Sequence, residues 1–333
     1  MSVNYILLIY ILITFLLFIV ILKASYKLNL VDVPNKRKTH SKPTAYTGGL
    51  VLSLSYIISN QLFEFGSNNL SMVISIAFLI SITGFVDDKY NLNIGGKLSL
   101  QIISIFYFIF SENMNLTHLG DYEYFKLELG TLTMPFTLLS ALFLINAFNY
   151  FDGIDGSLSF TVISVLTILY FLAPDKDIKI FLVIILLPII VFLFFNFSLF
   201  NLPKAFLGDS GSMLLGFIIS FILIFYSIKN ITHPILLAWS VAIFVYEFIS
   251  VNIERINNNK KLFKAGLDHL HHHLLKKNKS VFLTNFFLFS TNIILFITGY
   301  TVFNLVSPFA SLVVYILSFI AFFILRKKYF SLE

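Results

Sequence analysis

Long apolar segments recur along almost the whole chain and are separated by short polar connections. An α-helix needs about 20 apolar residues to cross a hydrocarbon core of about 30 Å. The pattern predicts eleven transmembrane helices, near residues 4–22, 47–65, 70–86, 97–110, 133–148, 158–173, 179–200, 211–228, 233–251, 283–303 and 306–325. Two of them, 97–110 and 133–148, are short for a full crossing, so we expect them to tilt, to thin the bilayer locally or to extend helically into the interface. The sequence therefore predicts an all-α polytopic membrane protein.

The composition supports this class and excludes several kinds of chemistry. Of the 333 residues, 58% are hydrophobic and 12% are charged, whereas a soluble domain carries about 25% charged residues. The absence of cysteine excludes disulfides, thiolate catalysis and cysteine-based zinc sites. The first apolar run, Ile6–Leu22, lacks a basic stretch before it and a cleavage site after it, so we expect a retained helix. No linker is visible, and we expect one membrane-embedded domain over residues 1–333.

Lys and Arg residues set the expected orientation, because cytoplasmic loops of membrane proteins are enriched in them. With the N-terminus outside, the loops on the cytoplasmic side hold 19 of the 23 Lys and Arg residues, and the outer loop 111–132 is acidic. We therefore predict an outside N-terminus, a cytoplasmic C-terminus and an active site on the cytoplasmic face, where five unusual polar clusters fall. The net charge of +6 could suggest binding to nucleic acid. In a membrane protein the side on which the charges lie matters more than their sum, so we expect no nucleic acid partner.

The most informative cluster is the loop Asn146–Gly156, which reads NAFNYFDGIDG between two apolar runs. Its carboxylates, Asp152 and Asp155, are costly to desolvate at the end of a membrane helix and so indicate a functional site. The neighbouring Gly153 lets the backbone turn sharply and a ligand approach closely. The alternative is a polar loop that only marks where a helix leaves the bilayer.

Two more clusters are acidic and lie at helix ends. The segment Gly84–Lys97 contains the adjacent Asp87 and Asp88 at the inner end of a helix. Negative charge there opposes the helix dipole and is destabilising unless a cation such as Mg²⁺ compensates it. The alternative is a solvated helix end. The segment Ala205–Phe217 places Asp209 where a helix begins. Asp209 is either an N-cap or part of a ligand site in which helix N–H groups meet phosphate oxygens.

The last two clusters are rich in cations and histidine. The loop 32–50 carries Lys36, Arg37, Lys38 and Lys42. A basic run beside the membrane is either a topology signal or an anion site for a phosphate group. The loop 252–282 carries His269, His271, His272 and His273 together with Arg255, Lys260, Lys261 and Lys264. The i, i+4 spacing of His269 and His273 permits zinc, but imidazoles that donate to phosphate beside cations are the favoured interpretation.

These clusters combine carboxylates and cations without a nucleophile–base pair. No P-loop, Rossmann glycine pattern or kinase signature is present. The combination favours metal-assisted phosphoryl transfer, in which positioning and charge neutralisation supply most of the rate. Because the clusters lie beside membrane helices, we expect one substrate to be a lipid.

The five clusters together resemble the motifs of the polyprenyl-phosphate N-acetylhexosamine-1-phosphate transferases, which form glycosyltransferase family 4. In chain order the matching segments are Arg37–Gly49, Asp87-Asp88, Asn146–Gly156, Phe206–Ser212 and His269–His272. They span residues 32–273. The number of predicted helices also resembles the bacterial branch that uses nucleotide-linked GlcNAc.

The resemblance implies that a sugar-1-phosphate passes from a UDP-sugar to undecaprenyl phosphate in the bacterial plasma (inner) membrane, with release of UMP. It implies Mg²⁺ as cofactor, with Mn²⁺ as a substitute. The implied catalytic residues are Asp87, Asp88, His271 and His272, and the implied metal ligands are Asp209 and Asp88. The implied substrate-binding residues are Lys36, Arg37, His40, Asn146, Asn149, Asp152, Asp155, Phe206, Arg255 and His269, with Phe206 as the aromatic that stacks on uracil. The sequence leaves open whether the protein forms a homodimer.

Three positions depart from the family pattern. Ala45 stands where a second proline is common, which suggests a less rigid loop. Glu247 replaces the usual aspartate, and Gly266 stands where the family commonly has an aspartate, with Asp268 two residues away. Since the loop around Gly266 touches the sugar in the family, the departures concern the identity of the sugar.

The sugar and the pathway therefore stay open. GlcNAc is the favoured sugar, and sugars of the FucNAc or QuiNAc type are the main alternatives. Transfer of phospho-MurNAc-pentapeptide is less favoured, because Leu274–Lys277 stand where that branch has an acidic residue. The product would begin a surface polysaccharide such as O-antigen, teichoic acid or capsule. A secondary transporter is the remote alternative, but it would need charges near the midplane and often shows internal repeats.

Overall fold

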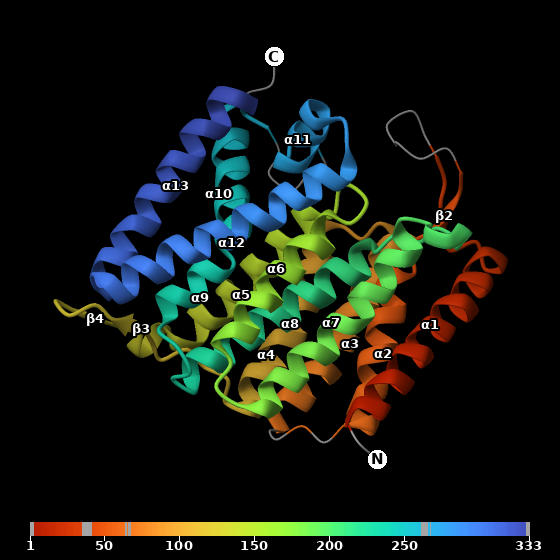
Figure 1. The fold of residues 1–333 in the computed structure, drawn as a ribbon, viewed down its shortest axis with the longest axis horizontal. Helices are drawn as coiled ribbons and strands as arrows, with labels where there is room; N and C mark the ends of the chain where they lie inside the picture. The colour runs from red at the N-terminus through yellow and green to blue at the C-terminus, as the bar shows by residue number, and fades with distance from the viewer. Residues whose placement is uncertain are drawn as a thin grey trace. The chain divides into compact units, whose positions relative to one another are not determined.

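Helices dominate the computed structural model, which describes residues 3–34, 42–63, 65, 68–260, 266 and 268–330. In chain order they are α1 (Val3–Lys27), α2 (Gly48–Leu62), α3 (Asn68–Tyr90), α4 (Ile94–Glu112), α5 (Thr133–Phe151), α6 (Ser157–Leu172), α7 (Lys176–Asn196), α8 (Gly208–Ile228), α9 (Pro234–Ser240), α10 (Ala242–Asn257), α11 (Leu270–Asn278), α12 (Val281–Leu305) and α13 (Pro308–Phe330) (Figure 1). Two short 3₁₀-helices are η1 (Gly130–Leu132) and η2 (Leu199–Asn201).

Two short antiparallel ladders accompany the helices. Strand β1 (Val31–Asp32) pairs with β2 (Thr44–Ala45), and β3 (His118–Asp121) pairs with β4 (Lys126–Glu128). The helix-length apolar pattern did not predict them, because each strand spans only two to four residues.

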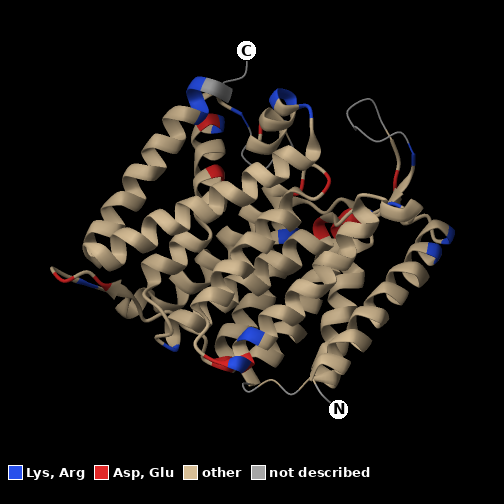
Figure 2. Cartoon of the chain, in the orientation of Figure 1, with Lys and Arg blue, Asp and Glu red and all other residues tan. Residues whose placement is uncertain are grey.

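Eight of the described helices are long and apolar enough to cross a membrane: α1, α3, α4, α5, α7, α8, α12 and α13. Helices α9 and α10 make a ninth if they count as one bent span, and the apolar α6 has only 16 residues. Figure 2 shows long uncharged stretches along most helices, with Lys, Arg, Asp and Glu mainly at helix ends and in loops. The polytopic all-α class is therefore confirmed. The count of eleven crossings and the orientation stay predictions.

The chain packs as two compact units, each formed from two separate stretches. The first comprises Met1–Glu112 and Asp175–Ile219, and the second comprises Asn113–Pro174 and Ser220–Glu333. Helix α8 thus belongs to the first unit up to Ile219. The expectation of one domain over residues 1–333 stays a prediction, and the two units are described separately below.

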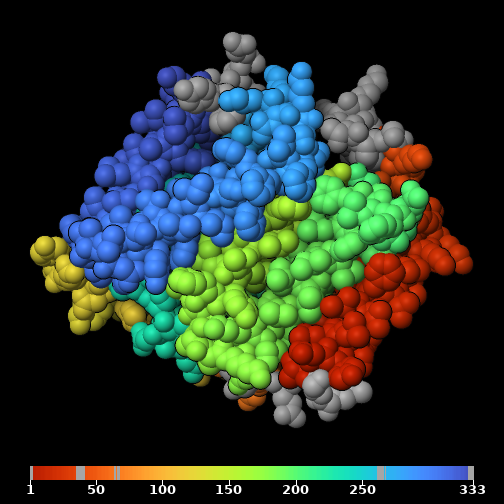
Figure 3. All heavy atoms as spheres, in the orientation of Figure 1, coloured from red at the N-terminus to blue at the C-terminus, as the bar shows by residue number. Residues whose placement is uncertain are grey.

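In the first unit, α1 packs against α2 and α7, α2 packs against α3 and α7, and α3 packs against α4. Figure 3 shows atoms of α7 (green) directly against those of α1 (red). Aromatic side chains make these contacts: the ring of Phe18 stacks on that of Phe195 at 4.7 Å. The hydroxyl of the buried Tyr56 donates to the carbonyl oxygen of Ile185 at 2.9 Å, because a buried phenol needs a hydrogen-bond partner.

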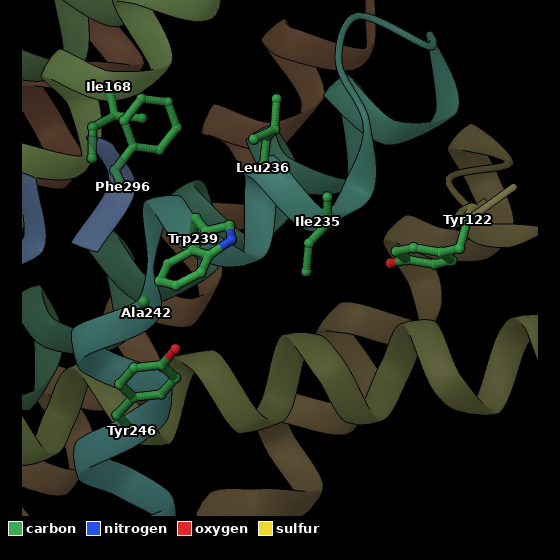
Figure 4. Packing of buried hydrophobic residues seen from close by; sticks show 8 residues of the cluster. All are labelled: Tyr122, Ile168, Ile235, Leu236, Trp239, Ala242, Tyr246 and Phe296. Atoms are coloured by element: carbon green, nitrogen blue, oxygen red, sulfur yellow. The ribbon is translucent and has the colours of Figure 1, made fainter. Parts of the chain in front are cut away.

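In the second unit, α12 lies along α6 and also packs against α9 and α13, as the blue and yellow-green atoms of Figure 3 show for α12 and α6. The cluster in Figure 4 has Trp239 between Leu236 and Tyr246. The indole Nε1 of Trp239 donates to Ser311 Oγ at 3.0 Å. A Cβ on Gly299 would lie 2.2 Å from the indole ring, so this position has no room for a side chain.

The predicted segment 233–251 is not one continuous helix. It breaks into α9 and α10, which meet at 71°. The buried Asn292 of α12 provides partners at the break, because its amide nitrogen donates to the carbonyl oxygen of Ser240 and to Ser164 Oγ, both at 2.9 Å. Its amide oxygen accepts from the backbone N–H of Ile243 at 3.5 Å. The break contains no proline or glycine, so the local sequence gave no signal for it.

Candidate active site

The first unit gathers three carboxylates and one lysine at the ends of α3, α4 and α8. We call Asp87, Asp88, Asp209 and Lys97 the carboxylate cluster. Asp88 Oδ1 accepts from the backbone N–H of Asp209 at 2.9 Å, and Asp88 Oδ2 accepts from that of Ser210 at 3.2 Å. The capping carboxylate at the start of α8 is therefore Asp88, which joins the end of α3 to α8. The N-cap interpretation of Asp209 is wrong.

Lys97 connects the other two carboxylates of the cluster. Its ammonium lies 2.8 Å from Asp87 Oδ2 and also contacts Asp209 Oδ2. Asp87 Oδ1 accepts from the backbone N–H of Leu92 at 2.8 Å. The side chains of Lys97 and Asp87 are 19% and 12% exposed, and that of Asp209 is 33% exposed, so Asp209 is the most exposed of these three.

Lys97 is a site residue that the sequence analysis did not single out. Its signal was available: it is the only charged residue between Lys89 and Glu112, and it stands at the start of an apolar helix. A lone lysine at a membrane helix end is usually a topology signal, so the sequence alone does not set Lys97 apart.

Backbone hydrogen bonds join two loops of the first unit, one before α2 and one before α8. The N–H of Phe206 donates to the carbonyl oxygen of Ala45 at 2.8 Å, and the N–H of Gly48 donates back to the carbonyl oxygen of Phe206 at 3.0 Å. Ala45 is fully buried, so these bonds fix the loop without the proline that the family often has. Gly208 has φ +73°, and a Cβ on it would lie 2.6 Å from Asp88 Oδ2; only glycine fits there comfortably.

The carboxylate cluster has the donor chemistry of a magnesium site. Mg²⁺ is usually held by one or two carboxylates and completed by water and substrate phosphates. Asp87 and Asp209 already converge on one cation, the Lys97 ammonium, so their oxygens fit this pattern. Among the residues that the structure describes, no three His, Asp or Glu side chains are grouped to hold a metal by themselves. A metal here would be completed by water and substrate oxygens, and the zinc interpretation of the histidines stays a prediction.

In the second unit, four histidines lie at the start of α11: His269, His271, His272 and His273. The ring centroids of His271 and His272 are 4.3 Å apart, and those of His269 and His271 are 5.7 Å apart. A Cβ on Gly153 would lie 2.0 Å from His271 Nε2 and 3.0 Å from His272 Nε2. Gly153 was expected to admit a ligand, but the groups packed against it are these two imidazoles.

Burial keeps the histidines neutral at pH 7. It lowers the pKa of His269 to about 3, although the carboxylate of Asp268 opposes this shift. Burial likewise lowers the pKa of His271, His272 and His273. His269 Nδ1 and His271 Nε2 are buried without a hydrogen-bond partner among the described residues. A buried polar atom without a partner is costly, so these two nitrogens fit a polar ligand atom.

Arg255 is largely occupied by contacts within the protein. Its Nε and Nη2 donate to the two carboxylate oxygens of Asp268, both at 2.8 Å, and Nη1 lies 3.4 Å from the hydroxyl of Tyr150. Burial raises the pKa of Asp268, but the hydrogen bonds and charge of Arg255 outweigh it and hold this pKa below its usual range. A Cβ on Gly266 would lie 2.3 Å from Asp268 Oδ1, so the Arg255–Asp268 pair occupies the space that a side chain at 266 would need.

The loop Asn146–Gly156 lies in the same unit as the histidines. The side-chain amide of Asn285 in α12 donates to the carbonyl oxygen of Asp155 at 2.8 Å, and Asp152 follows α5 as its C-cap. The side chains of Asn146, Asn149, Asp152 and Asp155 are half-buried. Their predicted contacts with a nucleotide stay predictions. Lys36, Arg37 and His40 lie outside the described residues.

Comparison with known proteins links these segments to one family. The model of the family "Glycosyl transferase family 4" matches residues 70–227, which include three of the five motifs. An undecaprenyl-phosphate alpha-N-acetylglucosaminyl 1-phosphate transferase of Escherichia coli O157:H7 is 25% identical over 263 residues, which cover 76% of this chain and 71% of the relative. A probable undecaprenyl-phosphate N-acetylglucosaminyl 1-phosphate transferase of Bacillus subtilis (strain 168) is 26% identical over 266 residues, 77% of this chain and 72% of the relative.

Residues 70–227 thus match glycosyl transferase family 4, and the two relatives support the same family. The predicted family is confirmed, and with it the description of the protein as a multi-pass membrane protein. Within the glycosyl transferase family 4 match lie Asp87, Asp88, Lys97 and Asp209, the whole carboxylate cluster. The histidines of α11 lie beyond residue 227, outside the match.

Proposed function

We propose that the protein transfers N-acetylglucosamine-1-phosphate from UDP-GlcNAc to undecaprenyl phosphate at the cytoplasmic face of the bacterial inner membrane. The observation that carries the proposal is the convergence of Asp87 and Asp209 on one cation, which suits the binding of phosphate groups together with Mg²⁺. The names of the relatives from Escherichia coli and Bacillus subtilis supply the lipid and the sugar.

The proposed reaction is a displacement at phosphorus. An oxygen of the lipid phosphate bonds to the phosphorus that carries the sugar, and the bond from this phosphorus to the bridging oxygen of UMP breaks. UMP leaves with that oxygen, and the sugar stays joined to the lipid through a pyrophosphate. A phosphate monoester has its second pKa near 6, so the lipid phosphate is largely dianionic at pH 7 and needs no general base. Asp87 then orients the reacting groups rather than taking up a proton.

Each member of the carboxylate cluster has its own role in this proposal. Asp87 and Asp209 would hold Mg²⁺, for which Mn²⁺ could substitute. When bound, the metal neutralises charge on the phosphate oxygens and so stabilises the transition state. Lys97 balances the two carboxylates, and Asp88, whose oxygens accept two backbone N–H groups of α8, fixes the end of α3. The metal role expected for Asp88 is not part of the proposal.

The histidines of the second unit would bind the sugar nucleotide. His269 and His271 offer nitrogens that have no partner within the described protein. A neutral imidazole both donates and accepts a hydrogen bond, and therefore suits sugar hydroxyls and diphosphate oxygens. We assign the remaining predicted contacts as follows: His272 to the same ligand, Asn146, Asn149, Asp152 and Asp155 to the nucleotide, Phe206 to the uracil ring, and Lys36, Arg37 and His40 to phosphate.

A lipid-transfer assay tests the proposal. Membranes or purified protein receive undecaprenyl phosphate, Mg²⁺ and radiolabelled UDP-sugars, and the label in the lipid phase is counted. We expect label from UDP-GlcNAc, release of UMP, and less label from UDP-sugars of the FucNAc or QuiNAc type. Preferred use of one of those sugars would change the substrate but not the reaction. Absence of lipid label with every UDP-sugar would remove the proposal.

The product would begin a surface polysaccharide. A sugar joined to undecaprenyl through a pyrophosphate must be consumed by glycosyltransferases that extend it. That polysaccharide would be an O-antigen, a teichoic acid or a capsule.

A further inference from the structure

The last helix, α13, carries a buried arginine beside two exposed lysines. Arg326 is 1% exposed, whereas Lys327 and Lys328 are exposed. The sequence analysis counted all three as a topology signal at the cytoplasmic end. A buried guanidinium is destabilising unless its charge is paired and its N–H groups are hydrogen-bonded. The partners of Arg326 therefore show what the side chain does.

Arg326 joins α13 to α10 and to the residue before the histidine helix. Its Nε donates to Glu247 Oε2 at 2.9 Å, and its Nη1 contacts Glu254 Oε2. Its Nη2 donates to the backbone carbonyl oxygen of Asp268. Glu247 is itself only 1% exposed, so the Arg326–Glu247 pair is fully buried.

Glu247 extends the same network to the other side of His269. Its second carboxylate oxygen, Oε1, accepts from the backbone N–H of Leu270 at 2.8 Å, which begins α11. Arg326 thus binds the carbonyl oxygen of Asp268, which precedes His269. Its ion-pair partner Glu247 binds the backbone N–H of Leu270, which follows His269. We call Arg326 and Glu247 the His269 clamp. The side chain of Asp268 is fixed in addition by Arg255.

We propose that Arg326 is a positioning residue, which acts through Glu247 and Asp268 to place His269 and α11 for the sugar nucleotide. The inference rests on the proposed function of the histidines. His269 Nδ1 and His271 Nε2 have no partner of their own among the described residues, so only the backbone and packing determine where they point. A displacement of about 1 Å can lower a rate about 100-fold, and a clamp on the backbone of His269 prevents such a displacement.

The first experiment separates position from charge. Arg326→Lys keeps the positive charge but loses the planar fork that reaches two carboxylates and a carbonyl. We expect the variant to stay folded in detergent with a lower melting temperature, because buried partners of the guanidinium lose hydrogen bonds, while KM and Kd for UDP-GlcNAc rise about tenfold or more. KM for undecaprenyl phosphate should not change. Lys327→Ala, at the next position of the same helix, is the matched control and should leave all four quantities unchanged.

The second experiment tests whether Arg326 acts through Glu247. We combine Arg326→Lys with Glu247→Gln and compare the double variant with each single variant in UDP-GlcNAc affinity. Because both changes open the same clamp, their effects should be much less than multiplicative. Multiplicative effects would show that the two residues act separately and would overturn the inference.

The remaining outcomes are also distinguishable. A lower melting temperature of Arg326→Lys with unchanged KM and Kd for UDP-GlcNAc would show a purely structural role and would overturn the clamp, while wild-type transfer would leave the proposed function intact. A wild-type protein that neither transfers label nor binds UDP-GlcNAc in calorimetry would overturn both.

Discussion

Gly153 and His271 are so close that a Cβ on Gly153 would lie 2.0 Å from His271 Nε2. Gly153 comes from the loop between α5 and α6, and His271 comes from α11, more than a hundred residues later. The contact explains why a glycine stands between two carboxylate-bearing positions of the loop. The imidazole can reach its buried position only because residue 153 has no side chain.

Gly153→Ala is therefore expected to displace His271 and lower transfer strongly. A shift of about 1 Å in a group that positions substrate costs about 100-fold in kcat/KM, and we expect a loss of that order. The lipid-transfer assay measures it. The control is Gly95→Ala, where a Cβ would meet its nearest neighbour at an ordinary 3.5 Å. Equal activity of Gly153→Ala and the wild type would show that His271 need not occupy its buried position.

The sequence predicted the helices well where length and hydrophobicity decide the outcome. Each of the eleven apolar segments coincides with helical residues. The break between α9 and α10 depends on Asn292, whose contacts are made across more than 40 residues, so no local pattern could reveal it. Helix α11 also escaped prediction, because its nine residues are too polar for the apolar pattern.

The candidate site was predicted in part. The motifs indicated Asp87, Asp88 and Asp209 separately, and the structure places them in one cluster; their roles stay predictions. Lys97 and Arg326 were missed for one reason: a single cation at a membrane helix end looks like a topology signal. Only the folded arrangement shows which cations are buried against carboxylates.

Removing a charge from the carboxylate cluster is expected to lower the transfer activity. Asp209→Asn keeps the shape but removes the anionic oxygen, so we expect a loss of about 10²–10³-fold in transfer that excess Mg²⁺ rescues poorly. Lys97→Met should also lower transfer, because Asp87 and Asp209 then repel each other without a compensating charge. Titration of Mg²⁺ against lipid-linked label measures both effects.

Lys89→Ala is the matched control for Lys97→Met, since Lys89 lies in the same segment and is exposed. It should retain wild-type transfer. Near-normal activity of Asp209→Asn at millimolar Mg²⁺ would remove Asp209 from the metal site.

The cysteine-free sequence allows a direct test of the predicted orientation. A single cysteine introduced by Tyr124→Cys lies in the outer loop 111–132, at a position that is 78% exposed. Lys276→Cys places one at an exposed position of α11, on the predicted cytoplasmic side. A membrane-impermeant maleimide should label the first in intact cells and the second only after permeabilisation. The unsubstituted protein is the control, and labelling of both positions from the same side would contradict the predicted topology.

Burial of the histidines predicts that the protein loses stability in mild acid. An unfolded imidazole binds a proton below about pH 6.5, whereas folded His269 does so only below about pH 3. Between these values the unfolded state binds more protons, so the free energy of unfolding falls as the pH falls. One such histidine contributes a slope of up to about 1.4 kcal/mol per pH unit.

The melting temperature of the detergent-solubilised protein between pH 7.5 and 4.5 measures this slope. His269→Gln removes one titrating group and should give a shallower fall, while His271, whose pKa burial also lowers, keeps part of it. If His269→Gln melts with the wild-type pH dependence, the imidazole of His269 is solvated in the folded protein, and its nitrogen cannot be the buried, unpartnered group that the proposed sugar-nucleotide site requires.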